Sequence, residues 1–114
     1  MKILVFGLSG SGKTTLAKPF AELINGTHIN ADDIRKKYDD WDFSMKGRHR
    51  QSLRMGHIAD GVVMAGKIAV VDFICPTAVT RDWFNADYTI WMDTIKESQY
   101  KDTDAIFQKP DIKD

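Results

Sequence analysis

A glycine-rich segment near the start of the chain constrains the fold more than any other feature. Gly7-Leu8-Ser9-Gly10-Ser11-Gly12-Lys13-Thr14 fits the pattern G-x-x-x-x-G-K-[ST] without a mismatch. The apolar run 3–6 before it predicts a buried strand, and apolar residues at helical spacing follow it over 16–24. A strand, a glycine loop and a helix in this order are the context of a phosphate-binding loop. The sequence therefore predicts that the chain binds a nucleoside triphosphate.

Each part of this loop has an expected role in holding Mg-ATP. Glycines let the backbone wrap closely around the phosphates, so that successive N–H groups and the new helix point at the anion. We expect Lys13 to reach the β- and γ-phosphates and the Thr14 hydroxyl to ligate Mg²⁺. The predicted ATP-binding residues are Gly7, Ser9, Gly10, Ser11, Gly12, Lys13, Thr14 and Thr15.

Length and charge narrow the class of protein. The 114 residues suffice for a single small domain, here a P-loop kinase domain over 1–114. The formal net charge is zero, so neither a long nucleic acid nor a membrane surface is an expected partner. Cys75 is the only cysteine, which favours a reducing compartment. The start lacks a signal-peptide pattern and no apolar run approaches the roughly 18 residues of a membrane span, so we expect a cytoplasmic protein.

Predicted strands and helices alternate along the chain. Strands are expected at 27–30, 67–74 and 88–92, and helices at 32–38, 48–65 and near 80–84. This alternation predicts an α/β fold with a small parallel sheet flanked by helices. Together with the loop, it indicates a three-layer P-loop NTPase of the nucleoside-kinase type. Residues 93–114 are polar and lack periodicity, so they are either a reduced, ordered lid over the site or a loose tail.

Two polar residues follow the second predicted strand, at the sheet edge where such folds bind ligands. A carboxylate at Asp32 can accept a proton from an acceptor hydroxyl or hold Mg²⁺, and Arg35 can bind an anionic acceptor. Lys13, Asp32 and Arg35 are therefore the predicted catalytic residues. The alternative is that Asp32 only caps the next helix and that Arg35 is a surface residue.

The other charged residues near the expected site each allow two interpretations. Asp72 ends an apolar strand, either as a carboxylate that holds Mg²⁺ or as a solvated strand end. Arg48, Arg50 and Arg54 crowd the start of the long helix, where they either meet an anionic substrate or pair with nearby aspartates. The three histidines show no metal-ligand spacing and are assigned no role.

Beyond the loop, the sequence resembles the adenylyl-sulfate kinase (APS kinase) family over roughly residues 1–93. Residues 29–35, Ile-Asn-Ala-Asp-Asp-Ile-Arg, are similar to that family's Leu-Asp-Gly-Asp-Asn-Val-Arg. Phe43-Ser44 followed by Arg48 resembles its Gly-Phe-Ser…Asp-Arg segment. Residues 72–76, Asp-Phe-Ile-Cys-Pro, resemble its Ala-Phe-Ile-Ser-Pro strand end.

The resemblance implies phosphoryl transfer from Mg-ATP to APS, a small nucleotide acceptor. It implies that Arg35 and Arg48 contact the sulfate-phosphate, that Phe43 stacks on the adenine, and that Asp32 serves Mg²⁺ and the 3′-hydroxyl. By loose match, Phe107 stands for the family's second stacking phenylalanine. The predicted acceptor-binding residues are then Arg35, Phe43, Arg48, Ile74 and Phe107, and the predicted metal ligands are Thr14, Asp32 and Asp72. The chain could also form a homodimer.

The chain departs from the family pattern at several positions. Asn30 stands where the family has the first aspartate of Asp-Gly-Asp, and Gln51 replaces an asparagine. The family's basic lid is missing: no arginine follows Arg81, and 93–114 holds six acidic residues against four lysines. A closing cation is normally part of phosphoryl transfer.

Two alternative functions therefore stay open. Asn30-x-Asp32-Asp33-x-Arg35 also resembles the Asn-Arg-Asp-Asp-x-Arg segment of polynucleotide kinases, in which the first of the paired aspartates deprotonates a 5′-hydroxyl. The third interpretation is a non-catalytic module that binds ATP without turnover.

Overall fold

The computed structural model describes residues 1–110, in which strands and helices alternate as the sequence predicts. In chain order the elements are β1 (Lys2–Phe6), α1 (Lys13–Leu23), β2 (Thr27–Asn30), α2 (Ala31–Tyr38), α3 (Met45–Met64), β3 (Ala69–Phe73), α4 (Ala78–Phe84), β4 (Tyr88–Trp91) and α5 (Lys101–Ile106).

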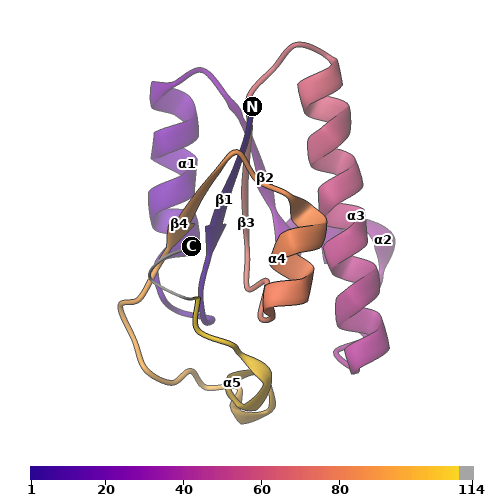
Figure 1. Cartoon of the computed structure of the whole chain (residues 1–114), viewed down its shortest axis with the longest axis vertical. Helices are drawn as coiled ribbons and strands as arrows, with labels where there is room; N and C mark the ends of the chain where they lie inside the picture. Colours follow the sequence, from indigo (N-terminus) through magenta and orange to yellow (C-terminus); the bar gives the residue numbers. More distant parts are fainter. Residues whose placement is uncertain (111–114) are drawn as a thin grey trace.

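The four strands form one parallel sheet in the order β2-β3-β1-β4. Their carboxyl ends therefore meet at one edge, at the lower end of the sheet in Figure 1. The register places Phe73 of β3 and Trp91 of β4 beside Phe6, and Asp72 beside Asn30 of β2. Ligands of open parallel sheets bind at this carboxyl edge, so the fold brings the residues that follow β1, β2 and β3 to one place.

Alternate residues of β1 face two different helical layers. Ile3 and Val5 pack with Ala17 and Ala21 of α1 on one face of the sheet. On the other face Leu4 and Phe6 belong to the larger core cluster, which includes Met55 and Ala59 of α3 and Phe84 of α4. The predicted three-layer α/β fold is confirmed, with α1 on one side of the sheet and α3 and α4 on the other (Figure 1).

The long helix α3 begins at Met45, earlier than the predicted start at Arg48. Ser44 is its N-cap, and the Ser44 hydroxyl accepts a hydrogen bond from the Gly47 N–H at 3.2 Å. A serine that caps the first turn explains why the helix extends into a polar stretch without apolar periodicity. Phe43 consequently lies just before the helix, at the sheet edge where the phosphate-binding loop is found.

Residues 93–110 form an ordered segment beyond the carboxyl edge of the sheet, with α5 at its far end (Figure 1). The Thr94 hydroxyl donates to the Ser11 carbonyl at 2.6 Å, which joins the start of the segment to the glycine loop. The Gln108 N–H donates to the Pro76 carbonyl at 2.6 Å, which joins its end to the turn after β3. Residues 111–114 lie outside the described part of the chain.

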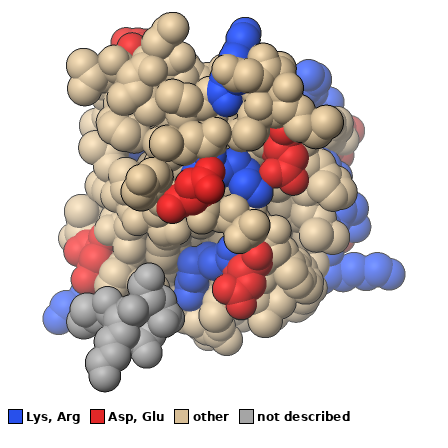
Figure 2. All heavy atoms as spheres, turned by 45° about the horizontal axis from the view of Figure 1, so that its top comes forward, with Lys and Arg blue, Asp and Glu red and all other residues tan. Residues whose placement is uncertain are grey.

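Charged side chains of both signs are interspersed on the face shown in Figure 2, in keeping with the zero net charge. Within the described residues, no helix has both the length and the apolar composition needed to cross a bilayer.

Candidate active site

The loop between β1 and α1 has the backbone conformation that its glycines were predicted to supply. Gly10 and Gly12 adopt left-handed φ angles of 83° and 94°, which side chains rarely tolerate. At Gly7 an added Cβ would lie 2.8 Å from the Met92 carbonyl oxygen, so the backbone directly after β4 leaves no room for a side chain. These positions require glycine, and α1 begins directly after Gly12 at Lys13.

Two polar side chains of this loop lack strong partners within the described residues. The Lys13 ammonium donates to the Leu8 carbonyl at 2.9 Å, and burial lowers its pKa while the Asp72 and Asp32 carboxylates raise it. The Ser11 hydroxyl is buried and has no hydrogen-bond partner there. A buried hydroxyl and a desolvated ammonium beside backbone N–H groups fit a bound polyphosphate.

Asp72 at the end of β3 is the centre of a hydrogen-bond network. It is only 2% exposed, so the interpretation as a solvated strand end is wrong. Its Oδ1 accepts from the Thr14 hydroxyl at 3.1 Å and from the Asn30 amide at 2.9 Å. Its Oδ2 contacts the His28 Nε2. The buried carboxylate thus lies beside the threonine that follows the loop lysine.

The side chains of Thr14 and Asp72 suit a Mg²⁺ ion that is shared with a nucleotide, and not a metal ion enclosed by protein side chains alone. Among residues 1–110, no group of three or more His, Cys, Asp or Glu side chains could enclose a metal ion. Mg²⁺ usually takes one or two protein oxygens, retains water and shares the phosphates of its nucleotide. The Thr14 hydroxyl and the Asp72 carboxylate offer oxygen atoms of this kind, 3.1 Å from one another.

His28 and Asn30 are site residues to which the sequence analysis gave no role. Both belong to β2 and lie two positions apart, so their side chains project to the same face of the strand. The parallel register pairs Asn30 with Asp72. The spacing of two on a strand next to an aspartate-ending strand was the signal that could have identified them.

One cavity of about 360 Å³ brings most of the predicted site residues together. It is open to solvent and lies between the glycine loop, the ends of β2 and β3, and the start of α3. The predicted residues that line it are Ser9, Gly10, Gly12, Lys13, Thr14, Thr15, Asp32, Arg35, Phe43, Arg48, Asp72 and Ile74. The rest of its wall is formed by Asn30, Ala31, Gln51, Ser52, Phe73, Cys75 and Pro76.

Arg35, Phe43 and Arg48 meet at the end of the cavity near α3. The Arg35 guanidinium carbon lies 4.4 Å from the centre of the Phe43 ring, and that of Arg48 lies 5.5 Å from it. Both arginines are buried, whereas Phe43 remains 49% exposed. The arrangement offers two cations and an aromatic surface to a ligand in the same cavity.

Three of the open questions about charged residues are settled by the contacts. Asn30, not Asp32, caps α2, because its side chain accepts from the Asp33 N–H, and Asp32 is left facing the cavity. Arg35 is buried, so the surface interpretation is wrong. Arg50 and Arg54 form ion pairs with Asp40, as the second interpretation of the basic cluster expected.

Phe107 is not brought together with Phe43. Its ring stacks on Phe6 with a centroid distance of 6.3 Å, and the Arg81 guanidinium lies 5.9 Å from its centre. It is also not among the residues that line the cavity. Phe107 packs against the core because the tail that carries it is anchored to the turn after β3.

The sequence model of the family described as adenylylsulphate kinase matches residues 1–109 of the chain. Curated adenylyl-sulfate kinases are similar to it: that of Shewanella denitrificans is 35% identical over 67% of the chain and 40% of its own length. That of Shewanella baltica is 32% identical over 74% of the chain and 44% of its own length. The chain therefore spans less than half the length of these relatives.

Solved structures support the fold at lower identity. The Mycobacterium tuberculosis APS kinase in complex with AMPPNP and APS matches with a TM-score of 0.72 and 24% identity, over 81% of the chain and 61% of its own. A sugar kinase from Janibacter matches with a TM-score of 0.74 and 15% identity, over 97% of the chain and 79% of its own. These matches confirm the predicted fold class.

The environment of Asp72 generates a first prediction about metal binding. Asp72→Asn preserves the size of the side chain but removes the charge that would meet Mg²⁺. We expect the Mg²⁺ concentration for half-maximal nucleotide binding to rise about tenfold or more. Calorimetric titration of ATP at graded Mg²⁺ measures it. Asp82→Asn, on an exposed position of α4, is the matched control, and equal metal titrations for the two variants would refute the assignment.

Proposed function

Because the chain belongs to the adenylylsulphate kinase family, we propose that it transfers the γ-phosphate of Mg-ATP to the 3′-hydroxyl of adenylyl sulfate. One observation carries the proposal: a single cavity is lined both by the glycine loop and by Asp32, Arg35, Phe43 and Arg48. A phosphate donor on the loop and an anionic, aromatic acceptor at the arginine end would then lie within one site.

In the proposed reaction the acceptor 3′-oxygen forms a bond to the γ-phosphorus while the bond from that phosphorus to the β–γ bridging oxygen breaks. The hydroxyl proton passes to the Asp32 carboxylate, and ADP leaves. Asp32 is suited to this role because it is exposed to the cavity and is not consumed as a helix cap. Lys13 would neutralise charge on the transferred group, and bound Mg²⁺, held by Thr14 and Asp72, would screen the phosphates.

The acceptor would be recognised by its two chemically different ends. The Phe43 ring provides a surface on which an adenine can stack, a contact worth ~1–3 kcal/mol. Arg35 and Arg48 provide donors for the sulfate and phosphate oxygens. This combination favours a small nucleotide with an anionic group over a neutral sugar.

A product analysis tests the proposal against its two alternatives. The protein is incubated with Mg-ATP and either adenylyl sulfate or a 5′-hydroxyl oligonucleotide, and phosphorylated products are identified by mass spectrometry. We expect 3′-phosphoadenylyl sulfate. Phosphorylation of the oligonucleotide alone would favour a polynucleotide-kinase activity, and ATP binding without either product would indicate a non-catalytic module.

The loop lysine gives the second prediction. Lys13→Ala removes the cation expected at the transferred phosphoryl group, so kcat/KM should fall about a hundredfold or more. The melting temperature should change little, because within residues 1–110 the ammonium donates a hydrogen bond only to the Leu8 carbonyl and forms no ion pair. Lys18→Ala on the exposed side of α1 is the control, and a Lys13 variant that matches it in turnover would contradict the assignment.

The third prediction concerns the proton acceptor. Asp32→Asn keeps the size of the side chain but cannot take the proton, so kcat should fall roughly a hundredfold while ATP affinity is retained. The neighbouring exposed residue provides the control, since Asp33→Asn makes the same change of charge outside the cavity. If kcat is equal in the two variants, Asp32 is not the base.

The fourth prediction tests the stacking surface. Phe43→Ala should raise the KM for adenylyl sulfate about tenfold and leave ATP affinity unchanged, because the stacking surface is lost at the arginine end of the cavity and the glycine loop is untouched. Trp41→Ala, in the same exposed loop but outside the cavity lining, should leave this KM unaltered. A fall in melting temperature without a change in KM would mean that Phe43 serves packing alone.

A further inference from the structure

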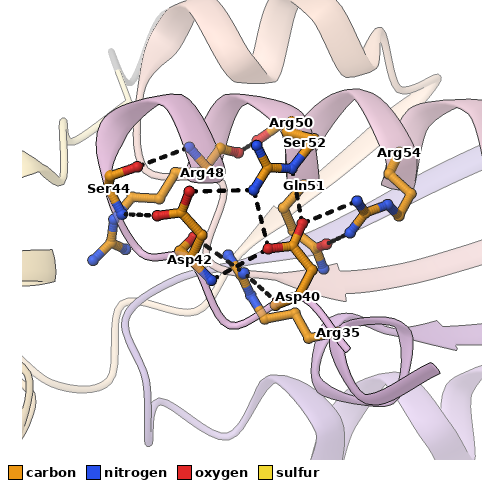
Figure 3. Close-up of polar contacts among 10 residues, drawn as sticks. Arg35, Asp40, Asp42, Ser44, Arg48, Arg50, Gln51, Ser52 and Arg54 are labelled. Atoms are coloured by element: carbon orange, nitrogen blue, oxygen red, sulfur yellow. Dashed lines mark hydrogen bonds and ion pairs between the residues drawn. The ribbon is translucent and has the colours of Figure 1, made fainter. Parts of the chain in front are cut away.

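The loop between α2 and α3 is held against α3 by a cluster of ion pairs, seen in Figure 3. The Asp40 carboxylate accepts from the Arg50 Nε at 2.9 Å, from the Arg50 Nη2 at 3.1 Å and from the Arg54 Nη2 at 3.0 Å. The Asp42 carboxylate accepts from the Arg50 Nη2 at 3.2 Å. Arg50 and Arg54 lie one helical turn apart, so both reach the same carboxylate.

Asp40 retains its charge in this setting. Hydrogen bonds from Arg50 and Arg54 hold the pKa of the Asp40 carboxyl far below its ordinary value. Bonds from the two arginines outweigh the opposing effect of burial. We call Asp40, Arg50 and Arg54 the Asp40 clamp.

The backbone of the same loop holds the buried arginine of the cavity. The Arg35 Nη1 donates to the Asp40 carbonyl at 2.9 Å and to the Asp42 carbonyl at 3.4 Å. Within the described residues Arg35 forms no ion pair with a carboxylate, so its guanidinium is oriented without being neutralised. The loop therefore contacts the arginines in two ways. Its carboxylates form ion pairs with Arg50 and Arg54, and its backbone carbonyls accept hydrogen bonds from Arg35 and orient it toward the cavity.

The loop is also packed closely on the start of α3. A Cβ added at Gly47 would lie 2.2 Å from the Asp42 carbonyl oxygen, so the backbone of the loop touches the first turn of the helix. The Phe43 carbonyl accepts from the Arg48 Nε at 2.7 Å. The position of Phe43 and the direction of Arg35 consequently depend on the same loop conformation.

We propose that Asp40 is a positioning residue for acceptor recognition: through Arg50 and Arg54 it fixes the loop whose carbonyls aim Arg35 and whose Phe43 faces the acceptor. Asp40 itself does not line the cavity. This proposal rests on the proposed function, since Asp40 is inferred to position the residues that bind adenylyl sulfate. Removal of the clamp should weaken acceptor binding and spare the ATP side.

The test compares Asp40→Asn with Asp39→Asn. Both variants lose one negative charge from neighbouring positions, but the Asp39 side chain makes no hydrogen bond or ion pair within the described residues. Asp39 also adopts a left-handed φ of 50°, which asparagine tolerates. We expect Asp40→Asn to raise the KM for adenylyl sulfate about tenfold, with kcat and ATP affinity within about twofold of the wild type. Asp39→Asn should match the wild type in all three.

Two further measurements complete the test. Asp40→Glu keeps a carboxylate that can pair with Arg50 and Arg54. It should therefore recover most of the acceptor affinity that Asp40→Asn loses. Hydrogen exchange of the backbone over residues 39–44 should quicken in Asp40→Asn and not in Asp39→Asn. An acceptor KM for Asp40→Asn equal to that of the control would overturn the proposal, as would equal losses of ATP and acceptor affinity.

The failure of the proposed function would look different. A wild-type protein that forms no product from adenylyl sulfate would refute that function and, with it, the role of Asp40 toward this acceptor. Faster hydrogen exchange in Asp40→Asn than in Asp39→Asn would then still support the Asp40 clamp as the element that orders the loop. Equal exchange in the two variants would refute that role too.

Discussion

The buried carboxylate of Asp72 is the interaction on which the arrangement of the site depends. An ionised group that is 2% exposed is costly unless it is well hydrogen-bonded. Its partners come from β2, through His28 and Asn30, and from the start of α1, through Thr14. The carboxylate therefore joins the glycine loop to the two neighbouring strand ends. The same contacts place a hydroxyl and a carboxylate together where Mg-ATP would need them.

The parts of the fold that repeat an apolar pattern could be predicted from the sequence, and the parts that depend on long-range contacts could not. The parallel sheet and the bounds of β2 were predicted correctly because apolar strands and turn residues alternate clearly. The start of α3 was misplaced because a single capping serine, not periodicity, determines it. The ordered tail was left undecided because its order comes from distant partners, such as the Arg81 Nη2 that donates to the Gln108 carbonyl at 2.7 Å.

Some residues of the candidate site could likewise be predicted from the sequence, and others could not. The residues that would bind phosphate follow one another in a motif. Asp32 and Arg35 lie in the short helix that follows β2, so their place at the carboxyl edge of the sheet could be expected. The charge pattern alone could not separate Arg48, which lines the cavity, from Arg50 and Arg54, which pair with Asp40, and only the family resemblance singled out Arg48. The choice of partner depends on which side of α3 the preceding loop takes, and that is a property of the folded backbone. Phe107 was misassigned because the path of the tail is not encoded in its local pattern.

The two cavity arginines, Arg35 and Arg48, differ in the partners that hold them. In the described part of the chain the Arg35 guanidinium donates hydrogen bonds only to carbonyl oxygens and forms no ion pair, so its charge is not paired with a carboxylate in contact with it. Arg48 pairs with Asp102 of α5 at 3.2 Å, but the Asp102 side chain is 73% exposed. Ion pairs between two exposed side chains contribute only about 0–1 kcal/mol, but the Arg48 side chain is only 8% exposed, so this pair is not an ordinary surface ion pair. Under the proposed function, an anionic acceptor would therefore meet Arg35 with its charge unpaired, whereas at Arg48 it would have to replace the Asp102 carboxylate.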